Sequence, residues 1–211
     1  MRKIQDHYFK KAQKEGYPAR SIYKLAEAQK KYRLLRPGAR VIDIGCRPGS
    51  WALYAAKIVG PGGLVVGVDI CPCPPLHVTG GARITVLQAD AMCDGIIPLV
   101  QGHCRRFDVL ISDIAPQTTG SKWADQQQSL LLSQRVLALT GPLLQPGGNF
   151  ICKVFEGEDF RQLVQEARRM FKMVKVFKPD SSRKESREVF ILGLQFQPPP
   201  ALSDSESLQG V

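Results

Sequence analysis

The chain has 211 residues, of which 44% are hydrophobic, and it carries a formal net charge of +10. We expect one globular domain and no membrane association, since no apolar run approaches the roughly 18 residues of a membrane span. The first residues, "MRKIQDHYFKKAQKEG", are charged where a secretory signal peptide would be apolar. We therefore expect a cytoplasmic protein, or an organellar one that has lost a transit peptide. The excess of Lys and Arg favours a polyanionic partner, but charge alone does not separate ribosomal RNA from tRNA or DNA.

Predicted strands and helices alternate along the chain. Two helices come first, at about residues 4–14 and 20–32. Apolar runs then predict seven strands, at residues 41–44, 63–70, 83–90, 106–116, 147–155, 173–178 and 187–196. Further helices are predicted at residues 50–60, about 125–140 and 158–171. This order predicts an α/β fold with a doubly wound, mostly parallel sheet and helices on both faces.

The end of the chain departs from this alternation. The last two predicted strands are joined by "PDSSRKES", which is too short for a helical crossover, so the final strand is predicted to be antiparallel. Residues 196–211 are rich in Pro and Ser and are predicted to be a disordered tail beyond a single domain of residues 1–195.

A glycine-rich turn in "VIDIGCRPGSW" joins the first predicted strand to a helix. Gly45 and Gly49 frame the turn, and Ser50 is placed to cap the helix. In open α/β sheets such a turn holds a small molecule, although its glycines can also serve packing alone. The spacing differs from the dinucleotide-binding G-x-G-x-x-G, and the sequence has no G-x-x-x-x-G-K-[ST] phosphate loop.

Four aspartates fall within or just after the carboxyl ends of predicted parallel strands: Asp43, Asp69, Asp90 and Asp113. Those ends share one edge of an open sheet, outside which the ligand crevice lies. Asp69 is placed to bind ribose hydroxyls and Asp90 an adenine amino group, although a single Asp after a strand more commonly caps a helix. An acid-rich site without a phosphate loop favours a cationic adenosine derivative, S-adenosylmethionine, over a dehydrogenase cofactor.

The six cysteines are scattered through the chain and indicate free thiols rather than a disulfide framework. Cys71, Cys73 and His77 lie close together in "CPCPPLH". Cys-Pro-Cys lacks the ligand spacing of structural zinc sites, so we predict a proline-stiffened loop and no metal site.

Several motifs in order resemble the RrmJ/FtsJ family of RNA ribose 2'-O-methyltransferases: "DIGCRPGSW", "VGVDI", "QAD", "SDIAPQ", "PGGNFICKVFEGEDF" and "KPDSSRKESREVFI". The resemblance covers about residues 10–194. It implies a Rossmann-like class I methyltransferase domain that uses S-adenosyl-L-methionine, with the helices of residues 1–34 contributing to RNA binding and catalysis. The implied substrate is a uridine ribose of large-subunit (23S-type) ribosomal RNA in the ribosomal particle, and we expect a monomer.

The resemblance also assigns site residues position by position. The implied catalytic set is Lys24, Asp113, Lys153 and Glu188. The implied cofactor-binding set is Gly45, Gly49, Trp51, Asp69, Asp90 and Asp113. Without the resemblance, Lys24 and Glu188 would be interpreted as ordinary surface charges. Lys153 differs, because a lysine within the apolar "FICKVF" either reaches solvent at the strand end or takes part in chemistry.

The chemistry suits these residue types. Methyl transfer from a sulfonium is an in-line displacement in which positioning supplies much of the catalysis. A ribose hydroxyl is a poor nucleophile until its proton is drawn away, so Lys153 is expected to act as the base or to steady the developing alkoxide. Asp113 is expected to orient Lys153, while Lys24 and Glu188 hold the reacting groups in line.

The roles of several residues, and the identity of the substrate, have alternative interpretations. Tyr8, Tyr17 and Tyr23 lie among basic residues and are placed to stack on a splayed base, with core packing favoured for Tyr23. Arg47 stands where the family usually has Ala, and its role is open. The alternative substrates are tRNA or another RNA. A different class of function is a ribosome-assembly RNA-binding factor with vestigial activity, against which the intact catalytic set argues.

Overall fold

The computed structural model describes residues 2–183 and 185–198, with side chains from residue 7 onward. The strands are β1 (Arg40–Ile44), β2 (Leu64–Asp69), β3 (Arg83–Gln88), β4 (Phe107–Ser112), β5 (Leu144–Phe155), β6 (Phe171–Phe177) and β7 (Glu188–Phe196). The helices are α1 (Arg2–Lys14), α2 (Ile22–Tyr32), α3 (Ser50–Val59), α4 (Ile96–Gln101), α5 (Lys122–Ala138), α6 (Thr140–Leu143) and α7 (Phe160–Met170).

The strands form one sheet in the order β3-β2-β1-β4-β5-β7-β6. Strands β1 to β5 run parallel, and β7 is antiparallel to both of its neighbours, β5 and β6. The predicted α/β fold and its antiparallel last strand are therefore confirmed. β1 pairs with β2 on one side and β4 on the other, so the strand order reverses there, and such a switch point is where doubly wound sheets bind ligands.

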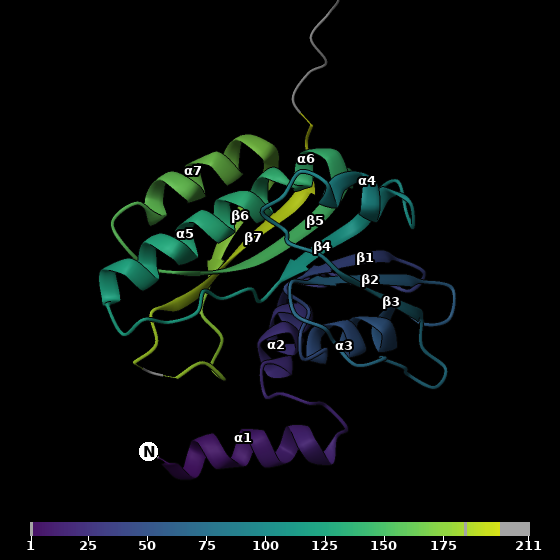
Figure 1. Ribbon diagram of the computed structural model, residues 1–211, viewed down its shortest axis with the longest axis horizontal. Helices are drawn as coiled ribbons and strands as arrows, with labels where there is room; N and C mark the ends of the chain where they lie inside the picture. The colour runs from purple at the N-terminus through teal and green to yellow at the C-terminus, as the bar shows by residue number, and fades with distance from the viewer. Residues whose placement is uncertain (1, 184, 199–211) are drawn as a thin grey trace, which may run out of the picture.

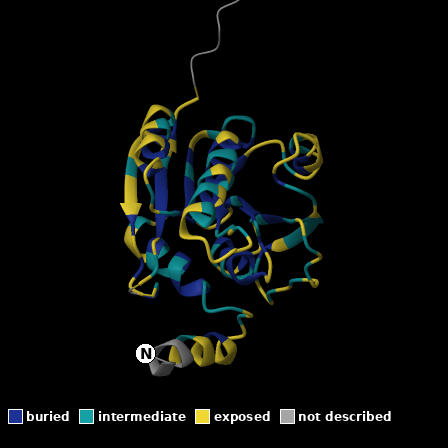
Figure 2. Ribbon diagram, turned by 60° about the vertical axis from the view of Figure 1, so that its left-hand side comes forward, coloured by how far each residue is buried: buried dark blue, intermediate teal, exposed yellow. Residues whose placement is uncertain are grey.

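Helices cover both faces of the sheet (Figure 1). On one face, apolar residues of α2 and α3 such as Leu25 and Ala52 pack against the sheet. On the other face, Val136 of α5 and Leu163 of α7 belong to a second apolar core. Strands buried on both faces are continuous apolar runs, which is why the central strands could be recognised from sequence. Figure 2 shows the buried sheet between the helices, whereas α1 lies largely exposed at the edge of the molecule.

Three details differ from the sequence-based expectations. The two short helices α4 and α6 were not predicted, because Pro and Gly in "IIPLVQ" and "TGPL" conceal their helical character. The predicted capping role of Ser50 is wrong. Gly49 is the N-cap of α3, and the Ser50 hydroxyl accepts a hydrogen bond from the Ala19 backbone N–H at 2.8 Å and donates to the Ala19 carbonyl at 3.2 Å. The segment before α2 therefore anchors to the start of α3.

Two expectations concern the membrane and the tail. Within the described part of the chain, no helix is long and apolar enough to cross a membrane. The predicted disordered tail falls mainly on residues 199–211, which lie outside the described residues.

Candidate active site

The glycine turn after β1 brings three chain segments together at the switch point. Gly45 has φ +76°, and a Cβ there would lie 2.8 Å from the Cβ of Ile114 in the segment after β4. Gly49 has φ +109°, and a Cβ there would lie 2.5 Å from a methyl of Leu76. Both positions combine a left-handed backbone with a close approach, so only glycine fits without displacing a neighbour.

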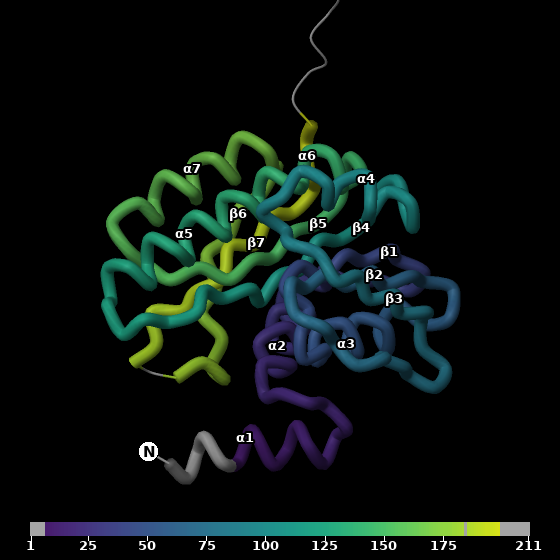
Figure 3. Tube along the Cα trace, in the orientation of Figure 1, coloured from purple at the N-terminus to yellow at the C-terminus, as the bar shows by residue number. Residues whose placement is uncertain are grey.

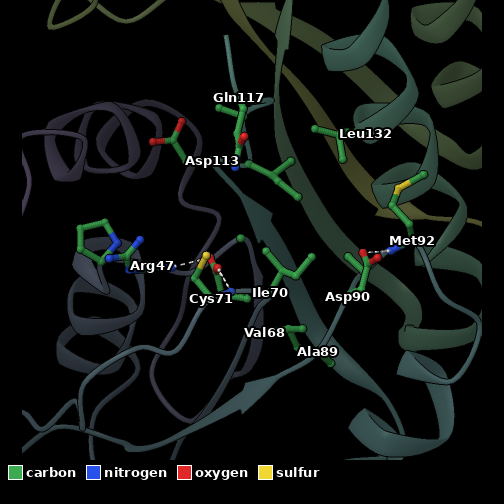
Figure 4. A pocket seen from close by; sticks show the side chains of 16 residues that line it. Arg47, Val68, Ile70, Cys71, Ala89, Asp90, Met92, Asp113, Gln117 and Leu132 are labelled. Carbon is green, nitrogen blue, oxygen red and sulfur yellow. Dashed lines mark hydrogen bonds between the residues drawn. The ribbon is translucent and has the colours of Figure 1, made fainter. Parts of the chain in front are cut away.

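A cavity of about 780 Å³ opens beside this turn (Figure 4). Its walls come from the turn itself, from the carboxyl end of β2 and from the segments that follow β3 and β4. Among the predicted cofactor-binding residues, those that line it are Gly45, Asp69, Asp90 and Asp113. The volume lies within the roughly 300–1,000 Å³ of small-molecule sites. The cavity is thus large enough for a nucleoside cofactor and carries acids on several sides.

Backbone hydrogen bonds fix two of these acids. The carboxylate of Asp69 accepts from the backbone N–H of Arg47 at 3.0 Å and of Cys71 at 2.9 Å. Asp90 accepts from the backbone N–H of Met92 at 2.9 Å. Each carboxylate retains lone pairs that these bonds do not use, so both remain able to accept from hydroxyl or amino groups of a ligand.

Asp43 does not line the cavity, contrary to the expectation that the four strand-end acids share one edge. It is 1% exposed within β1, and neither carboxyl oxygen has a well-directed hydrogen bond among the described residues. Burial raises the pKa of Asp43 well above its usual value, and the nearby charges of Asp113 and Asp69 raise it further, while the approaching Ala52 backbone N–H partly offsets this. Asp43 is one residue before the end of β1 and pairs with Gly67 of β2, two residues short of Asp69, so it is set back inside the sheet while Asp69 stands at its strand end.

Trp51 and Gly49 also lie outside the cavity lining. Trp51 is 3% exposed, its indole N–H donates to the Ser21 carbonyl at 2.9 Å, and its ring stacks on Phe190. It therefore joins α3 to α2 and β7. The cofactor-binding roles of Gly49 and Trp51 stay predictions.

The four predicted catalytic residues meet at one edge of the cavity, although they come from α2, β5, β7 and the segment after β4. The Lys24 ammonium lies 2.7 Å from a carboxylate oxygen of Glu188 and 3.5 Å from Oδ1 of Asp113. The Lys153 ammonium lies 3.1 Å from the same Asp113 oxygen and donates to the Asp113 carbonyl at 2.7 Å. We call Lys24, Asp113, Lys153 and Glu188 the tetrad.

Burial makes the tetrad unlike a surface ion pair. The side chains of Lys153 and Lys24 are 6% and 12% exposed, and that of Asp113 is 17% exposed. Two cations and two anions balance one another, which lowers the cost of burying them. Oδ1 of Asp113 faces both ammonium groups yet has no well-directed hydrogen bond among the described residues. The arrangement holds the Lys153 ammonium firmly beside a residue that also lines the cavity.

Sequence reasoning missed one polar residue of this site. The Ser182 hydroxyl donates to the second carboxylate oxygen of Glu188 at 3.0 Å. Ser182 lies in the "PDSSRKES" connection, which the sequence marked only as a short polar loop. The cysteines and His77 of "CPCPPLH" take no part in a metal cluster among the described residues.

The sheet topology, the switch-point cavity and its acids define the Rossmann-like class of methyltransferases. Residues 17–196 match the FtsJ-like methyltransferase family, and the chain belongs to that family.

Curated relatives cover nearly the whole chain. "Ribosomal RNA large subunit methyltransferase E" of Desulfotalea psychrophila is 48% identical over 204 residues, which are 94% of this chain and 99% of the relative. The protein of the same name from Syntrophobacter fumaroxidans is 44% identical and covers 92% of this chain and 97% of its own length.

Solved structures share the fold. A ribosomal RNA methyltransferase from Plasmodium falciparum superposes with a TM-score of 0.75 at 24% identity, covering 87% of this chain and 100% of that one. Aeropyrum pernix fibrillarin, solved with bound S-adenosyl-L-methionine, gives a TM-score of 0.58 at 18% identity, covering 82% and 76%.

Proposed function

We propose that the protein transfers a methyl group from S-adenosylmethionine to a ribose 2'-hydroxyl of large-subunit ribosomal RNA. The strongest support for this proposal is the position of Lys153. The Lys153 ammonium is buried and held by Asp113 at the edge of an acid-lined cavity. Such a group is placed to act on a hydroxyl brought to the mouth of the cavity.

The cavity residues fit the cofactor. Asp69, at the end of β2, has open acceptor capacity for the two ribose hydroxyls. Figure 4 shows Asp90 across the cavity from Arg47 and Cys71, where it can accept from an adenine amino group. Apolar side chains such as Ile114 and Leu132 supply walls for the adenine ring. The acids also favour a positive ligand, and the cofactor supplies a methyl group on a cationic sulfur.

The tetrad prepares the ribose hydroxyl. As the methyl is transferred, the ribose hydroxyl loses its proton either to Lys153 in its neutral amine form, or to solvent while the Lys153 ammonium steadies the negative charge on the oxygen. Asp113 holds the Lys153 ammonium with its side chain and its backbone carbonyl, which restricts the ammonium to one position. Lys24 is held by Glu188 and positions the ribose beside Lys153.

The substrate and the setting are proposed on three grounds. Relatives named for the large ribosomal subunit are 42–48% identical over most of the chain. The net charge of +10 suits a phosphate backbone. All four tetrad residues come from one chain, so we also propose a monomer. We propose that residues 1–195 form one methyltransferase domain. Its N-terminal helices supply Lys24 and contact RNA. A bacterial enzyme with this substrate works in the cytoplasm.

The test is methyl transfer from labelled S-adenosylmethionine to large ribosomal subunits, free ribosomal RNA and tRNA, all lacking the modification. Lys153→Ala is compared with Lys172→Ala, which removes an exposed lysine of β6. We expect label on a ribose of subunit RNA, lost in Lys153→Ala and kept in Lys172→Ala. Label on a base, or none on any RNA while RNA and cofactor still bind, would contradict the proposal. Label on a ribose of tRNA alone would contradict the proposed substrate but would agree with the proposed transfer to a ribose hydroxyl.

A further inference from the structure

A second cavity, of about 320 Å³, lies away from the cofactor cavity, where the segment after α1 passes over α2 and α3. Figure 3 shows α1 below these two helices, joined to α2 by one connecting segment. Three tyrosines line the cavity, Tyr17, Tyr23 and Tyr54, together with Glu15 and Lys57. The two cavities share no lining residue. We call this second one the tyrosine cavity.

Aromatic faces make up much of its wall. The rings of Tyr17 and Tyr54 are 6.5 Å apart between centroids and inclined at 58°, so the two rings are not stacked face to face on each other. Both tyrosines are only partly buried, whereas Tyr23 at the base is 9% exposed. Flat apolar faces that stay accessible to solvent suit a flat aromatic ligand, since stacking on them removes apolar surface from water.

Hydrogen-bonding groups of both kinds stand at the edge of the tyrosine cavity. The carboxylate of Glu15 accepts from the Tyr23 hydroxyl at 3.1 Å and still has lone pairs for further donors. Lys57 is exposed and lines the cavity. The Lys11 ammonium lies outside the lining, 4.9 Å from the centre of the Tyr23 ring and 3.9 Å from a carboxylate oxygen of Glu15. A ligand with ring N–H groups and ring carbonyls on one edge would find an acceptor and donors there, which is the pattern of a nucleobase.

The tyrosine cavity is mechanically tied to the tetrad. Tyr23 and Lys24 are successive residues of α2, so their side chains leave the helix about 100° apart, one toward each site. The Trp51 indole N–H donates to the Ser21 carbonyl, and Ser50 exchanges two hydrogen bonds with Ala19. The backbone around the start of α2 is thus fixed to α3, and a nucleotide held in the tyrosine cavity would place its RNA strand relative to Lys24.

We propose that the tyrosine cavity binds an unpaired nucleobase of the RNA substrate, at a nucleotide other than the one that is methylated. This inference rests on the proposed function and extends it to how the RNA is held. A protein segment would be the other kind of ligand, but the exposed Lys57 at the edge, with Lys11 close to the Tyr23 ring, favours a chain of phosphates. Base stacking on tyrosine gives affinity without much sequence preference, and it requires a base freed from its own stack.

The first test separates RNA binding from catalysis. Tyr54→Leu keeps an apolar side chain but removes the ring face, Tyr54→Phe keeps the face, and Tyr32→Leu removes a tyrosine that packs on Phe177 outside the cavity. We expect Tyr54→Leu to raise KM for large ribosomal subunits about tenfold. Its kcat and its affinity for S-adenosylmethionine should remain within twofold of the wild type. Tyr54→Phe and Tyr32→Leu should match the wild type. An unchanged KM in Tyr54→Leu would overturn the inference.

The second test does not depend on methyl transfer. Wild-type protein bound to large subunits is irradiated with ultraviolet light, and peptides carrying nucleotide adducts are identified by mass spectrometry. We expect an adduct on Tyr17 or Tyr54. RNA adducts only on other peptides, or crosslinks from Lys57 to a ribosomal protein instead, would contradict the inference. If adducts form on these tyrosines but no ribose is methylated, the proposed function fails while the base site stands.

Discussion

Asp108 and Asp113 lie at opposite ends of the same strand, β4, and their surroundings differ. The carboxylate of Asp108 accepts hydrogen bonds from the Arg36 side chain, from the backbone and side chain of Arg40, and from Gln145, at 2.5–3.1 Å. Burial tends to raise the pKa of Asp108, but the hydrogen bonds from Arg40 and Arg36 and the charge of Arg40 outweigh it and lower that pKa. The carboxylate at the amino end of β4 is saturated with donors.

Asp113, just past the carboxyl end of β4, is held differently. Its Oδ1 faces two ammonium groups at 3.1 and 3.5 Å, and no group in the described part of the chain gives it a well-directed hydrogen bond. A saturated carboxylate ties segments together, whereas an incompletely satisfied one can still respond to a ligand or a reacting group. Charge and burial alone therefore do not mark a functional acid, because Asp108 and Asp113 share both and differ in the acceptor capacity that their hydrogen bonds leave open.

The largest expected effect comes from removing the ammonium that Asp113 orients. Lys153→Ala should lower the single-turnover rate of methyl transfer by about 10²- to 10⁴-fold, because the ribose hydroxyl loses its base or its stabilising cation. The affinity for S-adenosylmethionine should change little, since Lys153 does not line the cofactor cavity. Rapid-quench kinetics and calorimetry give the two quantities.

Lys153→Arg is the companion variant. The guanidinium keeps the positive charge but is larger and planar, so it cannot occupy the position that the Asp113 carbonyl and carboxylate define for an ammonium. We expect a loss comparable to that of Lys153→Ala. If both variants kept near-normal rates, Lys153 would have no catalytic role.

At the other end of β4, Asp108→Asn should cost stability rather than activity. The amide presents a donor where an acceptor is needed, so at least one of its hydrogen bonds is lost, and we expect the free energy of unfolding to fall by about 2 kcal/mol. Denaturant titration measures this change. Methyl transfer by the folded variant should be within about threefold of wild type, and a much larger loss would mean that Asp108 also serves the site.

The pH dependence of stability tests the same role of Asp108. The pKa of Asp108 is lowered in the folded state, so its contribution to stability is present above the unfolded value of about 3.9 and is lost as pH falls through the folded pKa. The stability difference between wild type and Asp108→Asn should therefore narrow below about pH 4. A difference that stayed constant from pH 7 to pH 3 would show that the charge of Asp108 does not contribute.

The ionisation of Asp43 should change stability with pH in the opposite direction. Its folded pKa is raised, so the native protein keeps a proton that the unfolded chain releases above about pH 3.9, and wild-type stability falls as pH rises from there toward the folded pKa. Asp43→Asn lacks this titration. Its stability relative to wild type should increase between pH 4 and pH 7, and a parallel pair of stability curves would contradict the raised pKa.

The smallest effect is expected at the contact that ties the N-terminal segment to α3. Ser50→Ala removes both hydrogen bonds to Ala19, and we expect a loss of about 1 kcal/mol in the free energy of unfolding. Ser50→Thr keeps the hydroxyl and serves as the control for the loss of hydrogen bonding. Equal stability of the Ala variant and wild type would show that this anchor is energetically neutral.

Features set by neighbouring residues could be predicted from the sequence, whereas features set by contacts between distant residues could not. The strands and the antiparallel end were predictable because apolar runs and loop length are local. The cap assigned to Ser50 failed because its true partner, Ala19, is 31 residues away. Lys24 and Glu188 are separated by 164 positions, so no spacing rule could pair them, and only the family resemblance pointed to both. Asp43 differs from Asp69 in its depth along the sheet, because it pairs with Gly67, two residues before Asp69, and this register is not visible in the motif.

The most direct measurement compares the two ends of β4 in one assay. Asp113→Asn and Asp108→Asn make the same chemical change on one strand, and their single-turnover rates can be measured with saturating S-adenosylmethionine and large subunits that lack the modification. We expect a loss of at least about 100-fold for Asp113→Asn and less than about threefold for Asp108→Asn. Near-wild-type turnover by Asp113→Asn would contradict the role of the tetrad in the transfer.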